Sequence, residues 1–238
     1  MKRRQRRSIT PILVLALGVL LVIYGREYYQ ELRTGQRPLA LPVRIPPQEA
    51  PLLAARRVGI LVGHEGSDSG AICADGLSEV DVTRVIAQTL AQLLQETGTD
   101  IVLLAEYDAR LEGFQADALV AVHADSCIDR SGFKVARWTD SPNPARDDLL
   151  VACIVQAYLE RTGLPLDVTT VTENMTMYYA FRRIAPTTAA AIVETGYLGG
   201  DRTFLTEQPH LSALGIAEGL ICFFQMSTST PPNQTPEP

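Results

Sequence analysis

Several features that point to common function classes are scarce or missing in this chain of 238 residues. Its four cysteines include no Cys-x-x-Cys pair, which argues against a cysteine-based zinc site. Basic residues are outnumbered, with 21 Lys and Arg against 27 Asp and Glu, and five of the 21 lie within the first seven positions. The rest of the chain therefore has no basic excess for contacting phosphates, and we expect no nucleic-acid partner.

Apolar residues, in contrast, make up 46% of the chain, which excludes a wholly disordered protein. One uncharged run of 18 residues, 8–25, would span about 27 Å as a helix, close to the ~30 Å hydrocarbon core of a bilayer. No second run reaches this length, so we expect a single-pass transmembrane anchor at 8–25. The basic segment 1–7 then lies in the cytoplasm, and the rest of the chain lies outside.

Two alternatives to the anchor stay open at this point. A cleaved signal peptide has a shorter apolar region of about 7–15 residues and a small-x-small cleavage site. The run here is longer; it ends in Tyr24 and Gly25 and is followed by Arg26, Glu27 and Tyr28. A buried core helix is the second alternative. The length of the run favours the uncleaved anchor.

The segments after the apolar run differ in composition. Residues 26–55 hold five prolines and show no sustained periodicity, which predicts an extended extracytoplasmic linker. Residues 227–238 are rich in Pro, Ser and Thr, which predicts a disordered tail. The folded domain is therefore expected over 56–226.

Within this domain, short apolar runs alternate with helical patterns. We expect buried strands at 57–63, 100–105, 118–123 and 189–194, a half-buried strand at 132–138, and helices at 79–98, 147–162 and 209–225. Strands that are apolar on both faces indicate a covered sheet. The prediction is a single three-layer α/β domain whose mostly parallel or mixed twisted sheet is covered by helices and preceded by one transmembrane helix. In such folds, active groups cluster at the carboxyl ends of the strands.

Residues with metal or acid–base chemistry accompany these elements. His64 and His123 end two apolar runs, Glu79 begins the first helical pattern, and Glu194 ends a third apolar run. Two imidazoles and a carboxylate are typical of a catalytic zinc site, which keeps a fourth position for water. A further carboxylate can move the proton of that water to a leaving amine. Each residue alone also has a structural explanation, although burying an unpaired Glu194 would be costly.

Four motifs that contain these residues resemble the type 3 family of N-acetylmuramoyl-L-alanine amidases. They are GHEGSDSGA at 63–71, GLSE at 76–79, AVHAD at 121–125 and VETGYL at 193–198, and the similarity runs over essentially all of 56–226. The resemblance implies a phosphorylase/hydrolase-like fold, one Zn²⁺ per chain bound by His64, Glu79 and His123, and Glu194 as the catalytic acid–base residue. Members of the family cleave the amide between the muramic-acid lactyl group and L-alanine in peptidoglycan.

We therefore expect a zinc-dependent peptidoglycan amidase that acts in cell-wall remodelling. Its expected location is the bacterial cell membrane, with the catalytic domain facing the wall. Peptidoglycan and the membrane are the expected partners, and the need for a protein activator stays open. The main alternative is a catalytically weak or inactive amidase-like module that binds peptidoglycan fragments or regulates a wall enzyme. A zinc hydrolase of another amide is the third hypothesis.

Three departures from the family pattern bear on these alternatives. Glu65 replaces the glycine usual after the first motif histidine, and Asp125 replaces the asparagine usual two residues after His123. Either carboxylate can orient a ligand histidine from outside the metal's own ligands, or disturb substrate recognition. The stretch 106–117 is short and lacks the arginine usual before Tyr107, so we expect no inhibitory helix and an open groove.

The cysteines allow several states. Cys73 and Cys127 follow the first and third motifs, so they form a disulfide, stay as two free thiols, or take part in metal binding. Cys153 and Cys222 lie in apolar helical patterns and are expected to be plain core residues.

Two pairs near the last motif are also ambiguous. Arg182 and Arg183 either contact the anionic substrate or form a solvated surface pair, and the second is favoured. Tyr178 and Tyr179 fit a core or a groove equally well.

Overall fold

The computed structural model describes residues 44–229. The expected cytoplasmic segment 1–7, the anchor 8–25, most of the linker and the last nine residues of the tail lie outside the described residues.

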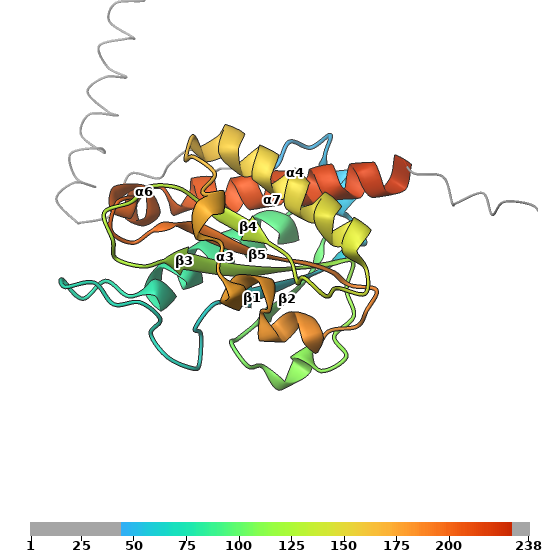
Figure 1. Cartoon of the computed structure of the whole chain (residues 1–238). Coiled ribbons are helices and arrows are strands. Elements are labelled where there is room, and N and C mark those ends of the chain that lie inside the picture. Colours follow the sequence, from blue (N-terminus) through green and yellow to red (C-terminus); the bar gives the residue numbers. More distant parts are fainter. Residues whose placement is uncertain (1–43, 230–238) are drawn as a thin grey trace, which may run out of the picture. The chain divides into compact units, whose positions relative to one another are not determined.

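A five-stranded sheet in the order β2-β1-β3-β5-β4 forms the centre of the fold (Figure 1). Its parallel strands are β1 (Arg57–Val62), β2 (Asp100–Leu104), β3 (Ala118–Asp125) and β5 (Ala189–Tyr197). At one edge β4 (Lys134–Ala136) pairs antiparallel with β5. The sheet is therefore mixed, one of the two arrangements that the prediction of a mostly parallel or mixed sheet left open.

Helices cover both faces of the sheet. On one face, α7 (Pro209–Ser229) packs between α3 (Glu79–Gln95) and α4 (Pro144–Thr162). On the other face lie short helical segments: η1 (Ala109–Leu111), α5 (Glu173–Thr176) and η3 (Tyr179–Arg182), below the sheet in Figure 1. The predicted three-layer α/β class is confirmed.

The alternation of side chains along the strands decides what faces this second layer. Leu119 and Ala121 of β3 and Ile192 of β5 belong to the hydrophobic cluster under η1, α5 and η3. His123 and Glu194 follow at two-residue spacing on the same strands, and therefore point to the same side. His123 and Glu194 therefore face the layer formed by η1, α5 and η3.

The folded part extends beyond the expected limits of 56 and 226. A short helix, α2 (Ala50–Leu53), lies in the expected linker, with Pro51 in its first turn, where proline is tolerated. Leu53 is fully buried and Ile45 nearly so. At the other end α7 continues to Ser229. Burial of these apolar residues explains why the segment packs on the domain despite its prolines.

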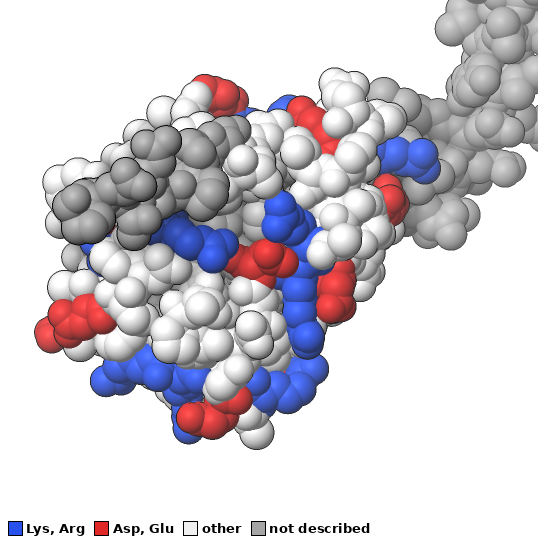
Figure 2. Space-filling model, turned by 90° about the vertical axis from the view of Figure 1, so that its right-hand side faces the viewer, with Lys and Arg blue, Asp and Glu red and all other residues white. Residues whose placement is uncertain are grey.

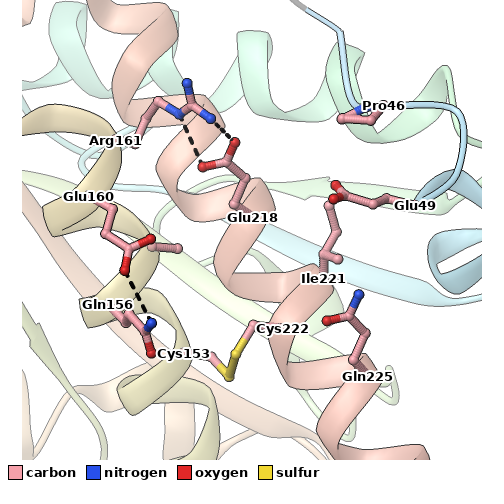
Figure 3. Close-up of a pocket in the computed structure, with 11 residues that line it drawn as sticks. Pro46, Glu49, Cys153, Gln156, Glu160, Arg161, Glu218, Ile221, Cys222 and Gln225 are labelled. Carbon is pink, nitrogen blue, oxygen red and sulfur yellow. Dashed lines mark hydrogen bonds and ion pairs between the residues drawn. A yellow bond between two sulfur atoms is a disulfide. The ribbon is translucent and has the colours of Figure 1, made fainter.

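Two disulfides join the four cysteines: Cys73–Cys127 and Cys153–Cys222. The expectation that Cys153 and Cys222 are plain core residues is wrong, because α4 and α7 pack together and bring their Cα atoms to 5.6 Å. Figure 3 shows this bond between the two helices, together with the ion pair of Arg161 and Glu218. The sequence pattern predicted both helices but not their pairing.

Among the described residues, α7 is the one helix long and apolar enough to cross a membrane. It packs instead against α3 and α4, and its residues Ile216, Leu220 and Phe223 are fully buried. These contacts make α7 a core helix of the domain.

The face shown in Figure 2 carries basic side chains interspersed with acidic ones. Among the described residues, Arg56 pairs with Asp117 at 3.3 Å and Arg57 with Asp100 at 3.6 Å, so part of the basic charge is balanced locally.

Candidate metal and catalytic centre

Three elements bring the predicted metal ligands together. His64 follows β1, Glu79 begins α3, and His123 lies near the end of β3. One ligand atom from each lies within 4.8 Å of the others. Oε2 of Glu79 is 3.1 Å from Nε2 of His64, and its Oε1 is 3.1 Å from Nδ1 of His123. The carboxylate thus bridges the two imidazoles.

Two glycines allow this close approach. A Cβ atom at Gly63 would lie 2.6 Å from the ring of His123. A Cβ atom at Gly70 would lie 2.5 Å from Oε2 of Glu79, and Gly70 also has a φ of +61°, which favours glycine. The loop between β1 and α3 therefore closes over the cluster only because these two positions lack side chains.

The charges of the cluster are strongly coupled. Burial opposes ionisation of Glu79, but hydrogen bonds and charge interactions with His123 and His64 lower its pKa to about 2. The hydrogen bond to Glu79, helped by Asp68, raises the pKa of His64 to about 9. The same carboxylate raises the pKa of His123 against the effect of its burial. An ionised carboxylate at the centre suits the site to a cation.

Each histidine has a second partner on its other ring nitrogen. Nδ1 of His64 lies 2.6 Å from Oδ1 of Asp68, and Nε2 of His123 lies 3.1 Å from the hydroxyl of Tyr178. Asp68 was not predicted as a site residue, although its position four residues after His64 in a glycine-rich turn was a usable signal. Tyr178 had no such signal, because it lies 55 residues from His123 in the chain.

Glu194 lies beside the cluster. It is the register partner of His123 on the adjacent parallel strand, and it lines the same cleft. Its Oε2 atom is buried and has no hydrogen-bond partner among the described residues. Burial raises the pKa of Glu194 to about 7, against the charges of His123 and Lys134. A carboxyl group with such a pKa can both accept and donate a proton near neutral pH.

The cluster lies in a cleft of about 720 Å³. Tyr178 and Tyr179, whose place the sequence left open, both line it. Of the stretch 106–117, only Glu106 and Tyr107 reach the cleft, and its one helical piece is the three-residue η1. The opposite wall comes from α5 and η3 of the second layer.

Glu65 and Asp125, the two carboxylates that replace other residues in the motifs, each have a basic partner. Oε2 of Glu65 accepts a hydrogen bond from Nε of Arg84 at 2.7 Å. Asp125 forms an ion pair with Lys134, a buried residue of β4 that lines the cleft. Neither carboxylate contacts a histidine ring in the part of the chain that the structure describes.

The donor set fits a zinc ion. Two imidazole nitrogens and one carboxylate oxygen form the ligand type of catalytic zinc sites. The thiols do not compete, because all four cysteines are disulfide-bonded. Glu194 lines the same cleft, and its buried Oε2 atom has no hydrogen-bond partner among the described residues, so this oxygen is available to a bound water or substrate.

Comparisons with known proteins agree with this geometry. Residues 58–220 match the model of a family described as N-acetylmuramoyl-L-alanine amidase. No curated protein matches the chain.

Among solved structures, the chain is similar in fold to the amidase Ami1 of Mycobacterium smegmatis, with a TM-score of 0.63 and 16% identity over 73% of this chain and 99% of that one. The CwlD amidase of Clostridioides difficile, solved in complex with the GerS lipoprotein, gives a TM-score of 0.58 and 16% identity over 72% and 99% of the two chains. The amidase AmiC2 of Nostoc punctiforme gives a TM-score of 0.51 and 23% identity over 72% of this chain and 97% of that one.

Proposed function

Because the chain belongs to the N-acetylmuramoyl-L-alanine amidase family, we propose that it is a zinc-dependent enzyme that cleaves the amide between the muramic-acid lactyl group and L-alanine of peptidoglycan. Membership of the family makes it a hydrolase of an amide bond. One observation carries the finer assignment: the ligand atoms of His64, Glu79 and His123 gather within 4.8 Å in the cleft that Glu194 also lines.

In the proposed mechanism, His64, Glu79 and His123 would hold one Zn²⁺, which when bound would polarise the lactyl carbonyl and make water more acidic. Glu194 accepts the proton of the attacking water while the new C–O bond forms. It then gives this proton to the departing nitrogen of L-alanine as the C–N bond breaks. Its pKa of about 7 makes both transfers feasible at neutral pH.

The alternative of an inactive binding module rested on Glu65 and Asp125. Arg84 and Lys134 balance their charges, so neither adds an unpaired carboxylate to the cleft. Since the ligand set and Glu194 are also complete, we favour the enzyme.

We also propose the surroundings of the reaction. Residues 8–25 would anchor the enzyme in the bacterial cell membrane with its N-terminus in the cytoplasm, and the linker would carry the domain toward the wall. The peptidoglycan substrate is found on that side of the membrane.

A substitution at Glu194 tests the mechanism. In the full-length protein, Glu194→Gln should keep one zinc per chain, measured by elemental analysis, and lose turnover of muropeptides by about 10²–10⁴-fold or more. Glu112→Gln, at an exposed position outside the cleft, is the matched control and should keep turnover. Turnover retained by Glu194→Gln would exclude its acid–base role.

A further inference from the structure

Glu106 is a buried carboxylate next to the metal cluster that the proposed mechanism does not use. It follows β2, and only 7% of its side chain is exposed. Its Oε2 atom is 3.8 Å from Nε2 of His123. A carboxylate at such a position is costly unless it is hydrogen-bonded, so its partners indicate what it does.

The first partner is the backbone of His64. The N–H of His64 donates to Oε2 of Glu106 at 2.9 Å. His64 has a φ of +67°, a left-handed conformation that is uncommon for residues other than glycine. The backbone N–H of Glu106 in turn donates to the carbonyl of Glu65 at 2.9 Å. These two hydrogen bonds join Glu106 to the turn that contains His64.

The second partner is Tyr178. Its hydroxyl donates to Oε1 of Glu106 at 2.8 Å, and its oxygen is 3.1 Å from Nε2 of His123.

These contacts decide which ring nitrogen of His123 is left for a metal. A carboxylate only accepts hydrogen bonds, and a phenol has one proton to give. Because Tyr178 gives that proton to Glu106, its oxygen accepts from Nε2–H of His123. Nδ1 of His123 faces the carboxylate of Glu79 at 3.1 Å, where a metal ion would replace its proton. Neutral imidazole with a lone pair on Nδ1 is the form that binds a metal.

We propose that Glu106 is a positioning residue for both histidine ligands: it fixes the backbone turn of His64 directly, and through Tyr178 it orients the ring of His123 so that Nδ1 faces the metal position. The inference rests on the proposed function, because it takes both histidines to be zinc ligands. Asp68 has the corresponding place on the ring of His64. Partners of this kind orient metal-binding histidines and raise their affinity for the metal.

Zinc affinity tests the proposal without measuring activity. The full-length protein is compared with Glu106→Gln and Tyr178→Phe, and zinc dissociation constants are measured by competition with a chromophoric chelator. The dissociation constant should rise roughly 10–100-fold in Glu106→Gln, and by a smaller factor in Tyr178→Phe, which keeps the bond from Glu106 to His64. Glu112→Gln is the matched control, because Glu112 is an exposed glutamate of the same stretch, and its affinity should not change.

The Nε2 proton of His123 gives a second measurement that a purely structural role would not move. In zinc-free protein with ¹⁵N-labelled histidine, the ring nitrogen shifts should show a proton on Nε2 of His123. In Tyr178→Phe the Nε2 shift of His123 should move and its proton should exchange faster with water, because the hydrogen bond to Tyr178 is lost, while the shifts of His64 stay unchanged. Circular dichroism and the unfolding temperature establish that each variant is folded.

The outcomes separate this proposal from the proposed function. If the wild type binds no zinc, the proposed function fails, and the Nε2–H measurement on His123 still tests the role of Glu106 and Tyr178. If the wild type binds zinc and folded Glu106→Gln binds it equally well, the positioning role is overturned. If Glu106→Gln does not fold, Tyr178→Phe decides: unchanged zinc affinity and an unchanged Nε2–H signal of His123 overturn the proposal.

Discussion

His123 on β3 and Glu194 on β5 are direct register partners in neighbouring parallel strands. Side chains at paired positions of adjacent strands point to the same face of a sheet and lie next to each other. The proposed metal ligand and the proposed acid–base residue are therefore held by the sheet itself. His64 and Glu79 come instead from a loop and from a helix start, so their positions depend on what holds the loop.

The Cys73–Cys127 disulfide is one such restraint, because it ties the loop between β1 and α3 to the segment after β3. Replacing both cysteines with serine should lower the free energy of unfolding by about 2–4 kcal/mol and also weaken zinc binding. The matched control is the double replacement of Cys153 and Cys222, which join α4 and α7 away from the cleft. It should lower the unfolding free energy but leave zinc affinity unchanged. Calorimetry with and without zinc measures both quantities, and equal zinc affinity in all three proteins would contradict the prediction.

Arg182 and Arg183 provide a matched pair for substrate recognition. Arg182 is exposed and lines the cleft, and it has no ion-pair partner among the described residues. Arg183 instead pairs with Glu112 at 3.5 Å. Since stem peptides carry carboxylates, Arg182→Ala should raise KM several-fold with little change in kcat, as expected for loss of a charge-assisted hydrogen bond. Arg183→Ala should leave both constants unchanged, and an equal effect of the two substitutions would contradict a role in the cleft.

Asp167 should make folding stability depend on acid pH. Burial opposes its ionisation, but hydrogen bonds from Tyr197, from two neighbouring threonines and from Arg130 hold the pKa of Asp167 below its usual range. A carboxyl group with a lowered folded-state pKa stabilises the fold above its unfolded pKa of about 3.9, and this contribution is lost as pH falls. In urea titrations, Asp167→Asn should therefore be less stable than wild type at pH 7, and the difference should shrink below about pH 4. Asp129→Asn, at an exposed position, should match wild type throughout. A constant difference for Asp167→Asn across this range would contradict the assignment.

Much of the fold could be predicted because buried parallel strands are nearly continuous apolar runs. The runs that become β1, β3 and β5 are of this kind, and His64, His123 and Glu194 stand out because each is a polar residue at or just beyond the end of such a run. The half-buried strand expected at 132–138 is shorter in the structure, where β4 has three buried residues. Its Lys134 is buried because Asp125 pairs with it, which the alternation of residues could not reveal.

The contacts that the sequence did not predict join residues far apart in the chain. Tyr178 and Glu106 are separated by 72 positions, and the N–H of His64 reaches Glu106 across 42. The bond of Cys153 to Cys222 spans 69 positions and follows from how α4 packs on α7. Local sequence patterns determine which helices and strands form, whereas these pairs depend on how the helices and strands pack against each other.

The most direct test of the central claim is mass spectrometry of muropeptides incubated with the full-length protein, with and without a zinc chelator. The account predicts release of intact stem peptides with a free L-alanine amino terminus, and loss of this release when the chelator is present. Glu194→Gln should release at least about 100-fold less. No cleavage by folded, zinc-loaded protein, or cleavage at a different bond, would contradict the proposed activity.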